Sequence, residues 1–156
     1  MSASHSMVLW SLARGAGLVS LVLLTISVLG GILTWSRWYR PGWPRFLTAT
    51  YHRNVSLLAV ALVVVHLAAL LLDHWSHVGG RTVLVPFSGT YRTVWTGLGS
   101  VAFWLIVLLV ATSLATRRIG WRTWRRIHWI AYACWPVAVL HGLGTGTDAR
   151  ARWYTA

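Results

Sequence analysis

Residues 57–72 read LLAVALVVVHLAALLL, a run in which His66 is the only polar side chain. Extended toward the N-terminus, the apolar pattern predicts a helix from about Tyr51 to Leu72. At about 1.5 Å per residue this helix is long enough to cross ~30 Å of hydrocarbon. An ionisable side chain within such a segment is costly and is usually functional. This one stretch therefore predicts a membrane helix and a role for His66.

The composition of the whole chain agrees with a membrane protein. Of the 156 residues, 56% are hydrophobic and 10% are charged, whereas a soluble domain carries about 25% charged residues. The net charge of +12 comes from 14 arginines and two acids, Asp73 and Asp148. We interpret the arginines as topology signals and expect no nucleic-acid partner, because no soluble basic face is left once the apolar segments are set aside. The single cysteine, Cys134, excludes an intramolecular disulfide, a CxxC pair and an iron–sulfur cluster.

Three further apolar segments complete the predicted fold class, which is an all-α integral membrane bundle of four transmembrane helices. They lie at about Met7–Thr34, Val94–Thr116 and Trp124–Leu143. The first one looks like a signal peptide, but it ends without a small-x-small cleavage site, so we expect it to be retained. We expect one domain over residues 7–143 and a short outer tail over residues 144–156.

The arginines also predict the orientation. The loops after the first and third helices together carry nine of them, and the opposite side carries five. By the positive-inside rule these two loops are cytoplasmic, in a multi-pass protein of the plasma membrane. We interpret the tryptophans near the helix ends as interfacial anchors and not as electron relays. The inner arginines are Arg37, Arg40, Arg45, Arg53, Arg117, Arg118, Arg122, Arg125 and Arg126; the outer ones are Arg14, Arg81, Arg92, Arg150 and Arg152.

Two pairs of histidines lie on the predicted helices. His52 and His66 are 14 residues apart on the second helix, and His128 and His141 are 13 apart on the fourth. Fourteen residues make about 3.9 turns, so His52 and His66 share one face. Thirteen residues make about 3.6 turns, which places His141 well round from His128 in a regular helix. Pro136 lies between them and is able to bend or rephase the helix.

The axial separations within the two pairs nearly match, at about 21 and about 19.5 Å. If the two helices run side by side, His52 faces His128 near the cytoplasmic side and His66 faces His141 near the outer side. Two facing neutral imidazoles suit a six-coordinate haem iron, whereas the distance between the pairs disfavours one tetrahedral zinc site. For His66 we expect a carbonyl one turn back to accept the second ring N–H. The alternative for any one histidine is a hydrogen bond between helices.

The pattern H-x13-H, followed two helices later by H-x12-H, resembles the membrane domain of ferric reductases and NADPH oxidases, in which four histidines bind two stacked b haems. Closer similarity is to the stand-alone bacterial ferric-reductase-like transmembrane proteins. Such proteins usually have another span after the second ligand pair, and this sequence ends 15 residues after His141. We therefore expect either a truncated product or a complete four-helix version. The matching stretches are WSLARGAG (10–17), HRNVSL (52–57), RRIHW (125–129) and PVAVLHG (136–142).

The resemblance implies transmembrane electron transfer by a ferric-reductase-like oxidoreductase or by an electron-transfer subunit of one. It implies two haem b, a separate flavoprotein or quinol as donor, and a ferric chelate, oxygen or a redox protein as outer acceptor. We expect no flavin or nicotinamide site in this chain. One alternative is an accessory membrane anchor that feeds a separate reductase, as in the methionine-sulfoxide-repair branch. Another is a non-redox haem-binding protein, while a channel or structural bundle leaves His66 unexplained.

Haem propionates need nearby cations or donors, and three arginines are candidates. Arg53 and Arg126 are close in sequence to the inner histidine pair, and Arg14 is near the outer pair. The alternative for Arg126, as for Arg125 beside it, is topology signalling, and Arg14 would otherwise snorkel outward. His74 and His77 form an H-x2-H pattern that suits iron, but we interpret it as a solvated loop. No catalytic residue is predicted, because only two acids are present.

Overall fold

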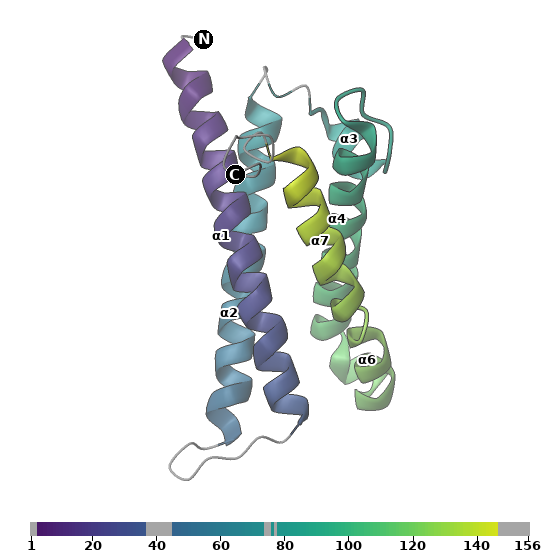
Figure 1. The fold of residues 1–156 in the computed structure, drawn as a ribbon. Coiled ribbons are helices and arrows are strands. Elements are labelled where there is room, and N and C mark those ends of the chain that lie inside the picture. The colour runs from purple at the N-terminus through teal and green to yellow at the C-terminus, as the bar shows by residue number, and fades with distance from the viewer. Residues whose placement is uncertain (1–2, 37–44, 74–75, 77, 147–156) are drawn as a thin grey trace, which may run out of the picture. The chain divides into compact units, whose positions relative to one another are not determined.

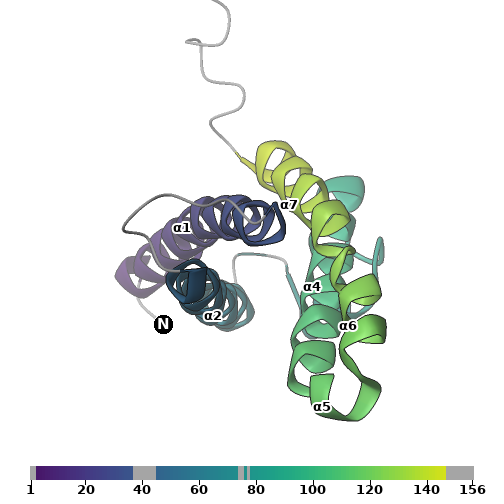
Figure 2. The ribbon, with the colours of Figure 1, turned by 90° about the horizontal axis from the view of Figure 1, so that it is seen from below.

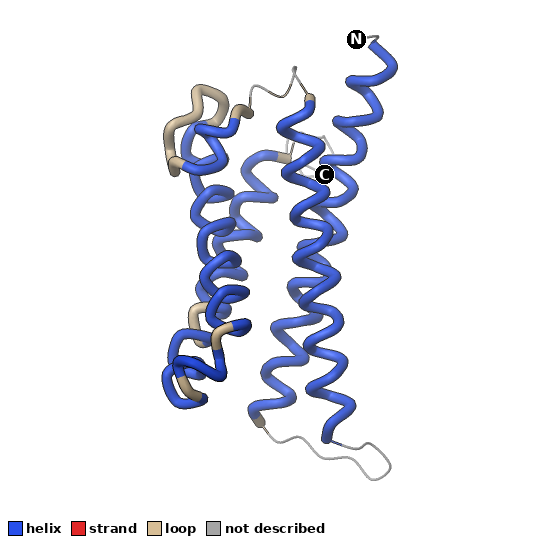
Figure 3. Tube along the Cα trace, turned by 180° about the vertical axis from the view of Figure 1, so that it is seen from behind, coloured by secondary structure: helices blue, strands red, loops and turns tan. Residues whose placement is uncertain are grey.

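The computed structural model describes residues 3–36, 45–73, 76 and 78–146, and every regular element in these ranges is a helix (Figure 3). The chain divides into two units, Met1–Ser76 and His77–Ala156, and each is described by itself. Some predicted features lie outside the described residues, and the side chain of Arg45 is among them. The others are Arg37, Arg40, His74, His77, Arg150, Arg152 and the tail beyond Gly146.

The first unit is a hairpin of two long helices, α1 (Ala3–Trp35) and α2 (Arg45–Leu72) (Figures 1 and 2). On α1, the small residues Ala13, Ser20 and Ser27 recur every seven positions and are at most 7% exposed. Seven residues make almost two turns, so they form one stripe along the helix. On α2, His52 and His66 belong to a stripe with the same interval, and buried Ala59 lies between them. Small side chains allow two helix backbones to approach closely, which is a common way to pack helices in lipid.

The second unit is built around α4, which packs against α7. A short helix, α3, covers the start of α4: Ser100 Oγ donates to the carbonyl of Thr82 at 2.5 Å, and Trp104 Nε1 donates to that of Leu84 at 2.8 Å. Two further short helices, α5 and α6, connect α4 to α7 (Figure 2). The bounds are α3 (Gly80–Leu84), α4 (Thr93–Leu114), α5 (Thr116–Ile119), α6 (Trp121–His128) and α7 (Ala131–Thr145).

Among the described residues, three helices are long and apolar enough to cross a membrane: Met7–Trp35, Phe46–Leu72 and Thr93–Leu114. The described chain is thus all-α, and its helices suit a multi-pass membrane protein. The continuous helix predicted over 124–143 is divided, because α6 ends at His128 and α7 begins at Ala131. The 15 residues of α7 reach about 22 Å, which is short of a full hydrocarbon layer.

The break between α6 and α7 is a tightened turn. Hydrogen bonds from Ile130 N to Ile127 O (2.9 Å), from Tyr132 N to Trp129 O (3.1 Å) and from Ala133 N to Ile130 O (3.0 Å) each span three residues. Such a 3₁₀ geometry turns the chain about 120° per residue instead of about 100°. The two residues between the helices, Trp129 and Ile130, both have a ψ of −21°, so they supply about 40° of the ~140° by which a regular helix would misalign the histidines on either side.

This tightened turn lies earlier in the chain than the predicted rephasing point. Helix α7 continues through Pro136. The departure from α-helical geometry instead follows directly after His128. The tightened turn is thus a second source of rephasing, and the role of Pro136 stays a prediction.

Candidate functional site

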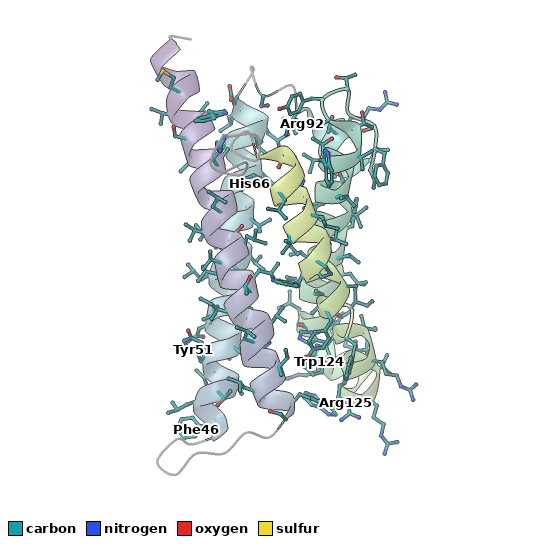
Figure 4. All side chains as sticks on the ribbon, viewed as in Figure 1. Phe46, Tyr51, His66, Arg92, Trp124 and Arg125 are labelled. Atoms are coloured by element: carbon teal, nitrogen blue, oxygen red, sulfur yellow. The ribbon has the colours of Figure 1, made fainter. Side chains whose placement is uncertain are left out.

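His66 lies in the part of α2 that is close to Leu72 (labelled in Figure 4), and it is anchored to α1. Its Nδ1 lies 2.7 Å from the carbonyl oxygen of Ala13. A carbonyl oxygen only accepts hydrogen bonds, so Nδ1 carries the proton and, in the neutral ring, Nε2 carries the lone pair. Gly17, one turn after Ala13, lies against the ring: a Cβ at this position would be 2.9 Å from Nδ1. The glycine therefore gives the imidazole the space to reach the backbone of α1.

His52 repeats this arrangement 14 residues earlier on α2. Its Nδ1 lies 2.8 Å from the carbonyl oxygen of Ser27 on α1. Gly31, again one turn farther on, lies against the ring, and a Cβ there would be 3.4 Å from Cε1. The hydroxyl of Ser27 is also 3.3 Å from Nδ1 and forms a 2.6 Å hydrogen bond with the hydroxyl of Ser56. The proton is again on Nδ1, since the carbonyl is the closer partner.

His141 has the same arrangement in the second unit. Its Nδ1 lies 2.7 Å from the carbonyl oxygen of Trp95 on α4. Gly99 follows Trp95 by one turn, and a Cβ there would be only 2.5 Å from Cε1. We call this arrangement a histidine seat: a carbonyl at position i of the neighbouring helix accepts from Nδ1, and a glycine at i+4 faces the ring.

The histidine seats contradict the hydrogen-bond acceptor predicted for His66, and they add glycines to the candidate site. The acceptor predicted for His66, a carbonyl one turn back in its own helix, is wrong, because the acceptor belongs to α1. Gly17 was not predicted as a site residue, whereas Gly31 was expected to permit the close approach of a helix or a haem. Their spacing of 14 equals that of His66 and His52, and this equality is a signal that the sequence does contain.

His128 at the end of α6 is held differently. Its ring stacks on Trp124, with centroids 4.8 Å apart and an interplanar angle of 26°. The indole Nε1 of Trp124 donates to Ser113 Oγ at 3.2 Å. Ser113 follows Gly99 by 14 residues, just as Gly31 follows Gly17. For the fourth histidine, the position equivalent to the seat glycines is therefore a serine, and the indole of Trp124 supports the imidazole of His128.

The geometry fits haem ligation. Metal-binding histidines usually donate the second ring N–H to a carbonyl or carboxylate, which orients the ring and fixes the tautomer. The histidine seats do this for three rings, which are only half-buried. Among the described residues there is no group of three or more His, Cys, Asp or Glu side chains suited to a metal ion. A haem iron needs only two axial protein ligands, because the porphyrin supplies the other four nitrogens.

The three predicted arginines occupy different surroundings. Arg14 directly follows Ala13, whose carbonyl is the acceptor in the His66 seat. It is half-buried, and its guanidinium carbon lies 4.7 Å from the ring centroid of Trp10. Arg53 and Arg126 are exposed, and each lies within two residues of a candidate ligand. Each of these arginines is thus close in sequence to a candidate ligand or to the residue that holds one.

Arg92 is a residue that the sequence did not identify as part of a site. Its Nη1 donates to the carbonyl of Gly144 at 2.6 Å, which ties the start of α4 to the end of α7. Arg92 and Trp95 line a cavity of about 470 Å³. The same Trp95 supplies the carbonyl of the His141 seat. The cavity is therefore next to a candidate ligand.

The described residues thus define an all-α protein with span-length apolar helices and with histidines anchored to the backbone across each helix pair. Residues 8–148 match the family described as a domain of unknown function, DUF8596, and the chain belongs to that family. This match includes all four candidate ligands. No curated protein and no solved structure matched the chain.

Proposed function

We propose that this protein binds two b-type haems through four histidines and carries electrons across a membrane, as a ferric-reductase-like membrane component. The observation that carries the proposal is the histidine seat, which occurs three times with one geometry. In each seat the neutral ring carries its lone pair on Nε2, the atom that binds a haem iron, so the seats hold three rings in the tautomer that ligation needs. The four ligands are His52, His66, His128 and His141.

The proposed arrangement is a bundle of four spans in the plasma membrane. Helices α1, α2 and α4 are three of them, and α6 together with α7 forms the fourth. His52 and His128 bind the inner haem, and His66 and His141 bind the outer one. This pairing is supported by the matched spacings of 14 and 13 residues and by the tightened turn after His128, which brings the second pair closer to one face.

The chain's own residues have three roles in this function. The seats hold the ligand rings, and each Nδ1–H donates to a backbone carbonyl, so the histidines act as ligands and not as acid–base groups. The apolar helices keep water away from the centres. Arg14, Arg53 and Arg126 bind propionates. Bound haem supplies a one-electron iron couple, the donor is a separate flavoprotein or a quinol, and the acceptor on the outer side is a ferric chelate, oxygen or a redox protein.

Haem stoichiometry tests the proposal. Purified protein is expected to give two haem b per chain by pyridine haemochrome assay, with low-spin bis-histidine spectra. His66→Ala is expected to remove only the outer haem and His52→Ala only the inner one, as resolved by redox titration. A stoichiometry near zero, or loss of both haems from either single variant that still folds and inserts, contradicts the proposal.

A further inference from the structure

Helices α5 and α6 form a strongly basic surface directly after the span-length helix α4 (Figure 4). Five exposed arginines lie on it within ten residues. The only carboxylate among the described residues is that of Asp73, which is buried in the other unit. Within the described part of the second unit, no carboxylate is present to neutralise this surface. The five are Arg117, Arg118, Arg122, Arg125 and Arg126.

An aromatic stack leads from the same surface to a proposed haem ligand. Trp121 is 61% exposed and stacks on Trp124, with centroids 4.5 Å apart. Trp124 in turn stacks on His128 at 4.8 Å and is fixed by its hydrogen bond to Ser113. The three rings occur at positions i, i+3 and i+7, so they form one stripe along α6. One end of the stripe is open to a partner, and the other end is the candidate ligand.

We propose that this surface, Thr116–His128, is the docking site for an acidic face of a separate one-electron donor protein, with Trp121 at the centre of the contact. Arginine and tryptophan are enriched among the residues that dominate protein–protein binding energy. A concentration of one charge also selects partners with the opposite charge and accelerates their encounter. In each encounter the partner gives up one electron, and no proton moves and no bond is made or broken. The inference rests on the proposed function in one respect, which is that His128 binds haem.

Helix α6 places Trp121, Trp124 and His128 on one side and Arg122, Arg125 and Arg126 on the other. The aromatic stripe ends at the candidate ligand His128, so a partner that delivers electrons is the occupant that this arrangement serves. Anionic lipid headgroups are the alternative occupant, and the test below separates the two.

The test is a binding experiment on the whole chain, in nanodiscs of phosphatidylcholine. The probe is flavodoxin, a small acidic flavin protein, and the control probe is basic cytochrome c. Flavodoxin is expected to bind with an affinity that falls as salt rises, and cytochrome c is not expected to bind. The variant R117E/R122E/R125E is expected to slow flavodoxin association about tenfold or more at low salt, whereas R81E, at an exposed arginine of α3, is expected to leave it unchanged.

Replacing the central indole separates the contact from simple charge attraction. Trp121→Leu is expected to weaken flavodoxin binding several-fold without changing the dependence on salt. Equal binding by wild type, the arginine variant and Trp121→Leu would overturn the docking proposal. A surface occupied by anionic lipid would overturn it as well: wild type in phosphatidylglycerol nanodiscs would then bind flavodoxin no better than the arginine variant.

The outcome is independent of whether the protein holds haem. Flavodoxin binding is read from complex formation, so it is measurable on haem-free protein. Binding without any haem in the pyridine haemochrome assay would support the docking surface and contradict the proposed function. Two haems per chain, together with flavodoxin binding that is insensitive to the arginine variant, would support the proposed function and contradict the docking surface.

Discussion

Whether a histidine can lie against a neighbouring helix depends on a single glycine. Gly17→Ala places a methyl group only 2.9 Å from Nδ1 of His66, which is too close for an unchanged ring position. The ring must then leave the carbonyl of Ala13, and a lost hydrogen bond of this kind costs about 1 kcal/mol. Because the ligand ring is displaced, we expect Gly17→Ala to lower outer-haem occupancy, measured by pyridine haemochrome and redox titration.

Gly15 is a matched control for this substitution. It lies on the same helix two residues earlier, and a Cβ there would meet nothing within 4 Å. Gly15→Ala is therefore expected to keep two haems with wild-type spectra. Equal haem loss in both variants would show that the effect comes from α1 as a whole and not from the histidine seat.

The support of His128 by Trp124 makes a graded prediction. Trp124→Phe keeps an aromatic ring for stacking but removes the Nε1–H bond to Ser113, and Trp124→Leu removes both. We expect the Phe variant to shift the reduction potential and EPR signal of one haem, Ser113→Ala to reproduce that shift, and the Leu variant to lose this haem. Trp104→Phe changes an indole that bonds to the carbonyl of Leu84, and it is expected to leave both haems unchanged.

At the level of elements, hydrophobic periodicity predicted the long helices well. The start of α4 differs from the prediction by one residue, and the end of α2 agrees. The short helices α3 and α5 were missed because too few residues are present to show a period. In α3 the contacts come from elsewhere in the chain, namely the side chains of Ser100 and Trp104.

Only part of the candidate site was predicted, because the rest depends on contacts between segments far apart in the sequence. A histidine within an apolar run is visible in the sequence, because its cost in lipid is a property of the residue itself. The histidine seat depends on which backbone carbonyl the ring reaches, and this is decided by helix packing. Arg92 was overlooked because its bond to Gly144 joins residues 52 positions apart.

The tightened turn between α6 and α7 has a testable consequence. Inserting one alanine between Trp129 and Ile130 turns the two helices relative to each other by about 100°. Because His141 remains in its seat on α4, we expect His128 to lose its alignment, so that haem stoichiometry falls from two to one. Pro136→Ala is expected to keep both haems, since α7 is already helical through this position. If Pro136→Ala lost haem and the insertion had no effect, the proline and not the tightened turn would be what aligns His128 with His141.

At the scale of the whole molecule, the described chain contains helices and their connections and no strand. Dinucleotide-binding folds need parallel strands, each followed by a helix, and they occupy roughly 100 residues or more. We therefore expect no dinucleotide-binding site among the described helices.

We accordingly predict that NADPH or NADH alone does not reduce the haem-loaded chain. A nicotinamide delivers a hydride, which carries two electrons, whereas each haem iron takes one, so a flavin or another carrier must divide the pair. The measurement is haem absorbance after mixing with excess NADPH in the absence of oxygen. Dithionite is expected to reduce the same sample, and added flavodoxin with a flavodoxin reductase is expected to restore reduction by NADPH. Prompt reduction by NADPH without a flavoprotein would require a nucleotide site within these helices, and the donor would then not need to be a separate protein.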